Sequence, residues 1–206
     1  MSAIKHWFKE QGWKPLAFQK ECWKAFAMGK NGMLHAPTGS GKTYALWGGI
    51  LQESLKQKKH PVGIQALWIT PLRALAVEIQ QATQRMTNDL QPDLKIALRT
   101  GDTSQSERGK QKRKPAFGLV TTPESLHILL SAKDHQKNIQ HLNTMVVDEW
   151  HELLGTKRGV QVELAIGYLR TFLPNLRVWG LSAPLGNKDL AREILLGPIE
   201  NYVTIN

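Results

Sequence analysis

Cysteine is almost missing from this sequence of 206 residues, which contains only Cys22. One thiol cannot form an internal disulfide, so the composition excludes a disulfide-stapled scaffold and favours a reducing cytosol. Cys22 stands in a stretch rich in Trp and Phe, and we expect it to be a core residue rather than a nucleophile. Residues 1–11 lack the apolar centre of a signal peptide, and no apolar run is long enough to cross a membrane.

Acidic residues are also scarce, because 17 Asp and Glu stand against 27 Lys and Arg, which gives a formal net charge of +10. Such an excess favours a polyanionic partner, most often nucleic acid, although a solvated basic surface has the same composition. The length fits one large domain, and 41% apolar residues are enough to fill a buried core.

Residues 36–43 (Ala-Pro-Thr-Gly-Ser-Gly-Lys-Thr) read as a phosphate-binding loop. Glycines permit a tight turn that points several backbone N–H groups into one cavity, next to the start of a helix. Lys42 supplies a charge for the β- and γ-phosphates, and Thr43 a hydroxyl for Mg²⁺. Ala36 replaces the usual first glycine with another small residue; a plain glycine-rich turn is the alternative interpretation. The expected nucleotide contacts are Thr38, Gly39, Ser40, Gly41, Lys42 and Thr43.

An acidic pair, Asp148 and Glu149, follows the apolar stretch 144–147. Carboxylates at the end of a buried strand are costly unless they bind a cation or another partner. In a phosphate-loop protein, a carboxylate at this place holds Mg²⁺. We therefore assign Asp148 to the metal through its waters, and Glu149 to the attacking water as general base or orienting group. A helix N-cap pair is the alternative interpretation.

Segments of strand and helix character alternate along the whole chain, which predicts an α/β fold with a mainly parallel sheet covered on both faces. We expect a loop or a poorly ordered helix over 104–114 and a polar linker over 133–141. The predicted strands are 32–35, 64–70, 95–99, 117–121, 144–147, 177–181 and 202–205. The predicted helices are 4–8, 18–28, 44–55, 73–86, 125–131, 160–172 and 187–196.

Two further residues are candidates from their position. Gln19 lies one short element before the phosphate loop, and its amide has both a donor and an acceptor with which to read an adenine edge. Arg73 lies just past a predicted strand end, where ligands gather in open α/β sheets. Trp13 and Phe18 lie close to Gln19; we expect core packing for both, with packing near the nucleotide base as the alternative.

The ordered motifs resemble the first RecA-like domain of a superfamily 2 helicase, a phosphate-loop NTPase fold. The likeness extends from about residue 7 to the last helix. The run 148–161 (Asp-Glu-Trp-His-Glu-Leu-Leu-Gly-Thr-Lys-Arg-Gly-Val-Gln) is similar to the large helicase-related (Lhr-like) branch, most of all its bacterial ligase-associated members. In order the motifs are Gln19 with Pro15 (Q motif), 36–43 (motif I), 70–76 (motif Ia), Gly101-Asp102 (the glycine motif), 121–126 (motif Ib), 148–151 (motif II, DEXH form) and 182–184 (motif III).

The resemblance implies an ATP-dependent, Mg²⁺-dependent DNA helicase that translocates on single strands, works in DNA repair and resides in the bacterial cytoplasm. Single-stranded or tailed DNA would be its partner, with a DNA ligase or nuclease as protein partner. His151 would join Lys42, Asp148 and Glu149 in catalysis and bridge the nucleotide site to Ser182, the coupling residue. The expected nucleic-acid contacts are Arg73, Gly101, Thr122 and Glu124.

Two departures qualify this expectation. Pro184 replaces the threonine of motif III, which removes a hydroxyl and an N–H from the motif that the family uses to couple hydrolysis to unwinding. The 206 residues account for one RecA-like domain, with 1–30 as its N-terminal helical segment, and the second domain with its arginine fingers is absent. We therefore expect part of a longer enzyme. An RNA helicase, and a nucleotide- and nucleic-acid-binding module without turnover, stay as alternatives.

Overall fold

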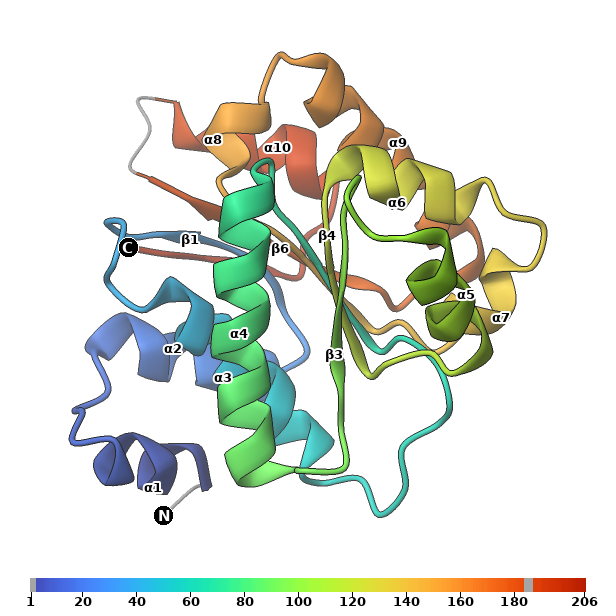
Figure 1. Ribbon diagram of the computed structural model, residues 1–206. Helices are drawn as coiled ribbons and strands as arrows, with labels where there is room; N and C mark the ends of the chain where they lie inside the picture. Colours follow the sequence, from blue (N-terminus) through green and yellow to red (C-terminus); the bar gives the residue numbers. More distant parts are fainter. Residues whose placement is uncertain (1–2, 184–186) are drawn as a thin grey trace.

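Seven parallel strands form one sheet in the order β3-β4-β2-β5-β6-β1-β7 (Figure 1). The expected parallel α/β fold is therefore confirmed. The structure is a computed structural model and describes residues 3–183 and 187–206. The strands are β1 (Asn31–His35), β2 (Ala66–Ile69), β3 (Ile96–Arg99), β4 (Gly118–Thr121), β5 (Thr144–Val147), β6 (Arg177–Ser182) and β7 (Tyr202–Ile205).

Helices cover both faces of the sheet. Helices α1 to α4 enclose one hydrophobic cluster, and α6 to α10 enclose the other. None of the described helices is both long and apolar enough to cross a membrane. The helices are α1 (Ala3–Glu10), α2 (Ala17–Ala27), α3 (Lys42–Ser54), α4 (Arg73–Leu90), α5 (Gln105–Arg113), α6 (Pro123–Leu130), α7 (His135–Ile139), α8 (Trp150–Leu153), α9 (Lys157–Phe172) and α10 (Lys188–Leu196).

The strands are apolar on both sides because both faces of the sheet are buried. In β2, Trp68 belongs to the cluster under α1 to α4, while Leu67 and Ile69 belong to the opposite cluster. Successive side chains of a strand point to opposite faces, so a continuous apolar run fills both cores at once. Cys22 is fully buried in the first cluster, and burial raises the pKa of its thiol.

The sheet order brings three loop regions to one edge. Strand β6 lies between β5 and β1, with Val147 opposite Gly180 and His35 opposite Ser182. Because all three strands are parallel, their carboxyl ends meet at this edge. The loop after β1, the acidic residues after β5 and the end of β6 are therefore neighbours.

Two helical segments differ from the expectation. The stretch 133–141, predicted to be a linker, contains the short helix α7, because its apolar residue Ile139 packs into the second core cluster. A one-turn helix, α8, follows Glu149 directly; its Trp150 is fully buried and donates its indole N–H to the Ala191 carbonyl at 2.8 Å. Helix α5 is a regular α-helix that Ser104 caps by accepting from the Glu107 N–H, where we expected a loop or a poorly ordered helix. The expectation for Pro184 lies outside the described residues.

Candidate nucleotide and nucleic-acid site

The loop after β1 has the backbone of a phosphate cradle. Gly39 and Gly41 have φ values of 78° and 86°, in the left-handed region that glycine enters without strain. Helix α3 begins at Lys42, so the free N–H groups of its first turn lie at the loop. A polyphosphate suits this arrangement, because backbone donors and a helix N-terminus converge where the sequence predicts it.

Lys42 is buried, with 7% of its surface exposed, and its charge is balanced inside the site. The Nζ atom donates to the Ala36 carbonyl at 3.0 Å and lies 3.7 Å from a Glu149 carboxylate oxygen. The amine therefore lies between the loop and the acidic pair, within reach of both.

Asp148 lies at the end of β5 with 4% of its surface exposed. Its carboxylate accepts hydrogen bonds from the Trp68 indole N–H at 3.2 Å and from the Glu149 backbone N–H at 2.9 Å. Burial, and then the adjacent charge of Glu149, raise the pKa of Asp148 to about 6. A nearby cation would relieve this cost.

Asp148 and Thr43 suit the way in which Mg²⁺ binds together with a nucleotide. The described residues contain no cluster of three or more His, Cys, Asp or Glu side chains able to hold a metal. Magnesium does not need one, since it commonly takes one or two carboxylates, waters and the oxygens of a bound phosphate. Asp148 and the Thr43 hydroxyl can complete such a set.

Glu149 is the one non-glycine residue with positive φ (47°) in the described part of the chain. This conformation is costly for a residue with a Cβ, and it turns the chain sharply from β5 into α8. The turn holds the carboxylate between Lys42 and His151, whose Nδ1 lies 3.4 Å from the second oxygen.

His151 connects the acidic pair to the end of β6. The Ala183 backbone N–H donates to Nδ1 at 3.3 Å, and the Ser182 hydroxyl lies 3.4 Å from the same atom. The other ring nitrogen, Nε2, faces Glu152 at 3.4 Å. The predicted bridge from motif II to Ser182 is therefore present as a chain of contacts.

Gln19 is held beside the phosphate loop, as the sequence indicates. Its Oε1 accepts from the Leu16 N–H at 2.9 Å, and its Nε2 donates to the Gly41 carbonyl at 3.2 Å. An amide oxygen has a second lone pair and an amide nitrogen a second hydrogen, so one acceptor and one donor remain for a base.

The cavity beside Gln19 has a volume of about 450 Å³ and aromatic walls. Trp13, expected in the core, instead lines this cavity with 41% of its surface exposed, and its ring centroid lies 5.5 Å from that of Tyr44. The expectation of core packing was therefore wrong for Trp13, whose ring borders an open cavity near the phosphate loop. Tyr44 was missed, although its place one residue after Thr43 was a usable signal.

The predicted nucleic-acid contacts lie around the same edge of the sheet. Arg73 opens α4 and pairs with exposed Asp102 at 2.8 Å, which brings it beside Gly101. Thr122 is buried and caps α6 by accepting from the Ser125 N–H, so its hydroxyl serves the fold. Glu124, in the first turn of α6, is partly exposed.

Arg158 connects the start of α6 to the segment before α4. We did not predict this residue from the sequence, where its only signal was its place in the run 148–161. Its Nε donates to Glu124 at 2.5 Å and its Nη1 to the Pro71 carbonyl at 3.3 Å. Burial alone would raise the pKa of Glu124, but hydrogen bonds from its own N–H, Thr122 and Arg158 hold it below its ordinary value.

A groove of about 710 Å³ is lined by residues of the phosphate loop, of the start of α4 and of the segment that follows β5. Thr38 of the phosphate loop, Glu149 and His151 line one end, and Leu72 and Arg158 line the other. Leu72 is 57% exposed. The groove therefore presents apolar and charged groups side by side, and Glu149 of the acidic pair is among them.

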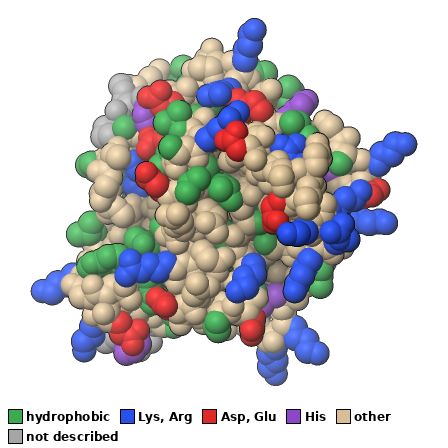
Figure 2. Space-filling view, viewed as in Figure 1, with side chains coloured by type: hydrophobic (Ala, Val, Ile, Leu, Met, Phe, Trp, Pro, Cys, Tyr) green, Lys and Arg blue, Asp and Glu red, His purple; other side chains and the backbone are tan. Residues whose placement is uncertain are grey.

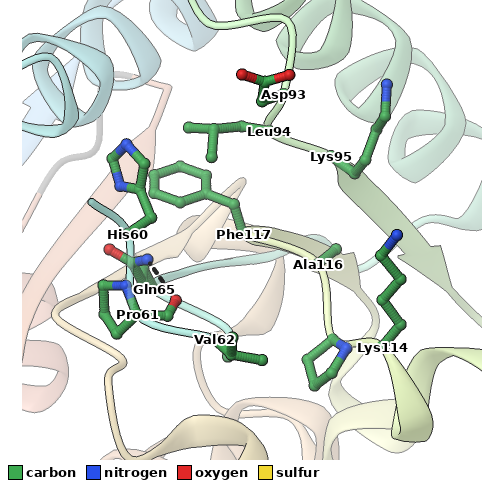
Figure 3. Close-up of a pocket in the computed structure, with 12 residues that line it drawn as sticks. His60, Pro61, Val62, Gln65, Asp93, Leu94, Lys95, Lys114, Ala116 and Phe117 are labelled. Carbon is green, nitrogen blue, oxygen red and sulfur yellow. Dashed lines mark hydrogen bonds between the residues drawn. The ribbon is translucent and has the colours of Figure 1, made fainter. Parts of the chain in front are cut away.

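A separate cavity of about 380 Å³ lies at the opposite edge of the sheet, before β2 and β4 (Figure 3). The Phe117 ring lies near the His60 ring, and Gln65 donates to the Pro61 carbonyl. None of its lining residues belongs to the phosphate loop or the acidic pair, so it takes no part in the site above.

The comparisons agree with this geometry. The family model described as DEAD/DEAH box helicase matches residues 16–192. Lhr helicase/uracil glycosylase of Escherichia coli is 31% identical over 192 residues, which are 83% of this chain and 12% of that protein. ATP-dependent helicase Lhr-Core of Sulfolobus acidocaldarius is 31% identical over 98% of this chain and 24% of that protein.

A solved structure, Mycobacterium smegmatis helicase Lhr bound to ssDNA and AMP-PNP, superposes with a TM-score of 0.82 at 28% identity. The match covers 99% of this chain and 27% of that one, so the chain spans about a quarter or less of the length of these relatives. The chain therefore belongs to the DEAD/DEAH box helicase family, and its RecA-like domain resembles those of Lhr-type helicases.

Proposed function

We propose that this domain binds Mg-ATP and single-stranded DNA and is the ATP-binding half of a DNA helicase or single-strand translocase. One observation carries the proposal: Lys42, Glu149, His151 and Ser182 form a continuous series of contacts from the phosphate loop to the end of β6. A nucleotide at the loop would change the first contact, and the series leads to the segment that couples hydrolysis to movement.

Each residue has a role that follows from its contacts. Lys42 leaves the Ala36 carbonyl and Glu149 to bind phosphate oxygens, since a phosphate is the stronger acceptor. Asp148 and Thr43 would hold Mg²⁺, which would neutralise part of the charge on the phosphates when bound. Glu149, once released from Lys42, accepts a proton from the attacking water.

The nucleotide base would occupy the cavity beside Gln19, stacked against Trp13 and Tyr44. Arg73 would hold a backbone phosphate, while Arg158 would position Glu124 and the chain at Pro71. The basic net charge of +10 supports a polyanionic partner. The single cysteine supports a cytoplasmic location, and we extend the proposal to a DNA-repair role with a ligase or nuclease partner.

Nucleotide titration tests the proposal. We expect Lys42→Ala to bind Mg-ADP roughly 10- to 100-fold more weakly, because a hydrogen bond to a charged group contributes about 1.5–3 kcal/mol. Lys95→Ala is the matched control, since this exposed lysine lies at the opposite edge of the sheet. Equal affinities for the wild type and Lys42→Ala would contradict the loop assignment.

The choice of DNA rests on the ssDNA named for the Mycobacterium smegmatis relative. The second candidate, an RNA helicase, is kept because Mss116p bound to ssRNA has the same fold, with a TM-score of 0.77 at 20% identity. Competition of labelled single-stranded DNA by RNA of the same sequence separates the two. Equal or better competition by RNA would favour the second candidate, because only a 2′-hydroxyl contact distinguishes the strands.

A further inference from the structure

A further cavity of about 340 Å³ lies between α5, α6 and α7, away from the nucleotide groove. None of its lining residues lines the groove or the base cavity. Its polar walls come from the end of β3, from α5 and from the segment around α7. They are Arg99, Gln105, Arg108, Lys112, Asp134 and His135.

Two arginines of this cavity have unused donors. The Nε atoms of Arg99 and Arg108 are buried from solvent and have no hydrogen-bond partner among the described residues. Arg108 still uses one Nη atom, which donates to the Thr100 and Gly101 carbonyls at 3.2 and 3.4 Å. Burial, and then the charge of Arg108, lower the pKa of Arg99. A buried donor without an acceptor is costly, so an acceptor that reaches these two groups would stabilise them.

The other charged groups of the cavity do not supply that acceptor. Lys112 pairs with Asp134 at 2.8 Å, so the only carboxylate in the wall already has a cation. His135 bonds the Ala132 carbonyl with one ring nitrogen and the Tyr168 hydroxyl with the other. The cavity therefore keeps two guanidinium charges that no anionic group of its own wall neutralises.

We propose that this cavity is an oxyanion site of the phosphate class, held by the Arg99 and Arg108 guanidinium groups. A guanidinium presents several N–H donors in a plane, which match the oxygens of a phosphate better than a lysine does. The ligand is either a phosphodiester of bound nucleic acid or free inorganic phosphate. The site does not depend on the nucleotide function proposed above.

Continuity with a basic surface favours the nucleic-acid backbone as the source. Arg108 contacts the Gly101 loop, which is one of the predicted nucleic-acid contacts. Helix α5 buries no residue, and its exposed side adds Lys110 and Arg113. Figure 2 shows the Lys and Arg side chains gathered on the right of the molecule, where Figure 1 places α5. A single strand of nucleic acid that leaves this edge of the sheet would thus meet further positive charge.

Arginine side-chain NMR tests the proposal directly, because each Nε–H group gives its own signal. Inorganic phosphate is added to the Lys42→Ala protein, in which the phosphate loop no longer contributes. We expect downfield shifts of the Arg99 and Arg108 Nε–H signals as these donors gain an acceptor. Unmoved signals with both phosphate and single-stranded DNA would overturn the proposal, whatever the outcome at Lys42.

Binding of labelled single-stranded DNA by charge-matched variants identifies the source. Arg99→Gln should bind roughly tenfold more weakly and lower the salt slope by about one, as expected for one lost phosphate contact. Arg113→Gln removes the same charge from α5 without touching the cavity and should change binding less. Shifts with phosphate, together with equal DNA binding by both variants, would support the site with free phosphate as its ligand.

The NMR measurement needs no arginine variant, so a folding defect cannot hide the answer. Arg99→Lys, which keeps the charge but loses the planar donors, should recover only part of the DNA affinity. Full recovery would argue against two-donor recognition and reduce the site to a general positive potential, which would also overturn the proposal.

Discussion

The buried carboxylate of Asp148 should lower the stability of the nucleotide-free protein. The substitution Asp148→Asn should recover part of that lost stability. The pKa of this carboxyl rises from its ordinary 3.8 to about 6 in the folded protein. At about 1.4 kcal/mol per pKa unit, the full cost is about 3 kcal/mol. Because the folded pKa is the higher one, the folded state binds more protons, so the cost is absent below pH 4 and complete above pH 6.

These two pKa values give a cost of about 1.6 kcal/mol at pH 5 and about 3 kcal/mol at pH 8. The difference in free energy of unfolding between Asp148→Asn and the wild type should therefore grow by about 1.4 kcal/mol between the two pH values. The absolute gain is smaller, because an amide cannot accept from both the Trp68 indole and the Glu149 N–H in its favoured orientation.

Urea denaturation without metal or nucleotide measures this difference. Asp93→Asn serves as the matched control, since this exposed carboxylate lies at the opposite edge of the sheet and the substitution is chemically the same. A difference for Asp148→Asn that stays constant from pH 5 to pH 8 would refute the reasoning, because burial would then not disfavour the charged form. The same variant should lose Mg²⁺-dependent nucleotide binding.

Two further predictions concern Glu149 and the glycines of α9. In a chain that carries a second RecA-like domain, Glu149→Gln should keep ATP binding and lose DNA-stimulated hydrolysis, because an amide is a poor base. A steady-state ATPase assay checks this. Retained turnover would show that Glu149 is not the general base. Gly159→Ala should destabilise the domain by about 2 kcal/mol or more, since a Cβ there would lie 2.2 Å from the Leu153 carbonyl. Gly167→Ala in the same helix meets nothing within 4 Å and should stabilise it by about 0.5–1 kcal/mol; thermal denaturation that ranks the two variants the other way would contradict this.

The sequence alone predicted those parts of the fold that depend on local signals. Strand character and alternation gave the parallel sheet, and the phosphate loop and Asp148 were placed from residue type and spacing. Helix α7 was not predicted, since one apolar residue, Ile139, gives no periodicity and the helix depends on its contact with the core. The order of strands is likewise set by packing of distant segments, which no local pattern contains.

The candidate site shows the same limit. The tie from Arg158 to Glu124 joins residues 34 positions apart, and the bond to Pro71 spans 87. Contacts between residues so far apart in the sequence give no signal in the local composition. The left-handed conformation of Glu149 is also invisible in the sequence, because the residue there is not glycine; the surrounding contacts hold it.

The position of β1 in the sheet has a consequence for how the chain folds. Both neighbours of this strand come from the last part of the chain, β6 over Arg177–Ser182 and β7 over Tyr202–Ile205. During synthesis the phosphate-loop strand therefore emerges long before either of the two strands with which it pairs. Such long-range pairing slows folding and exposes intermediates to aggregation.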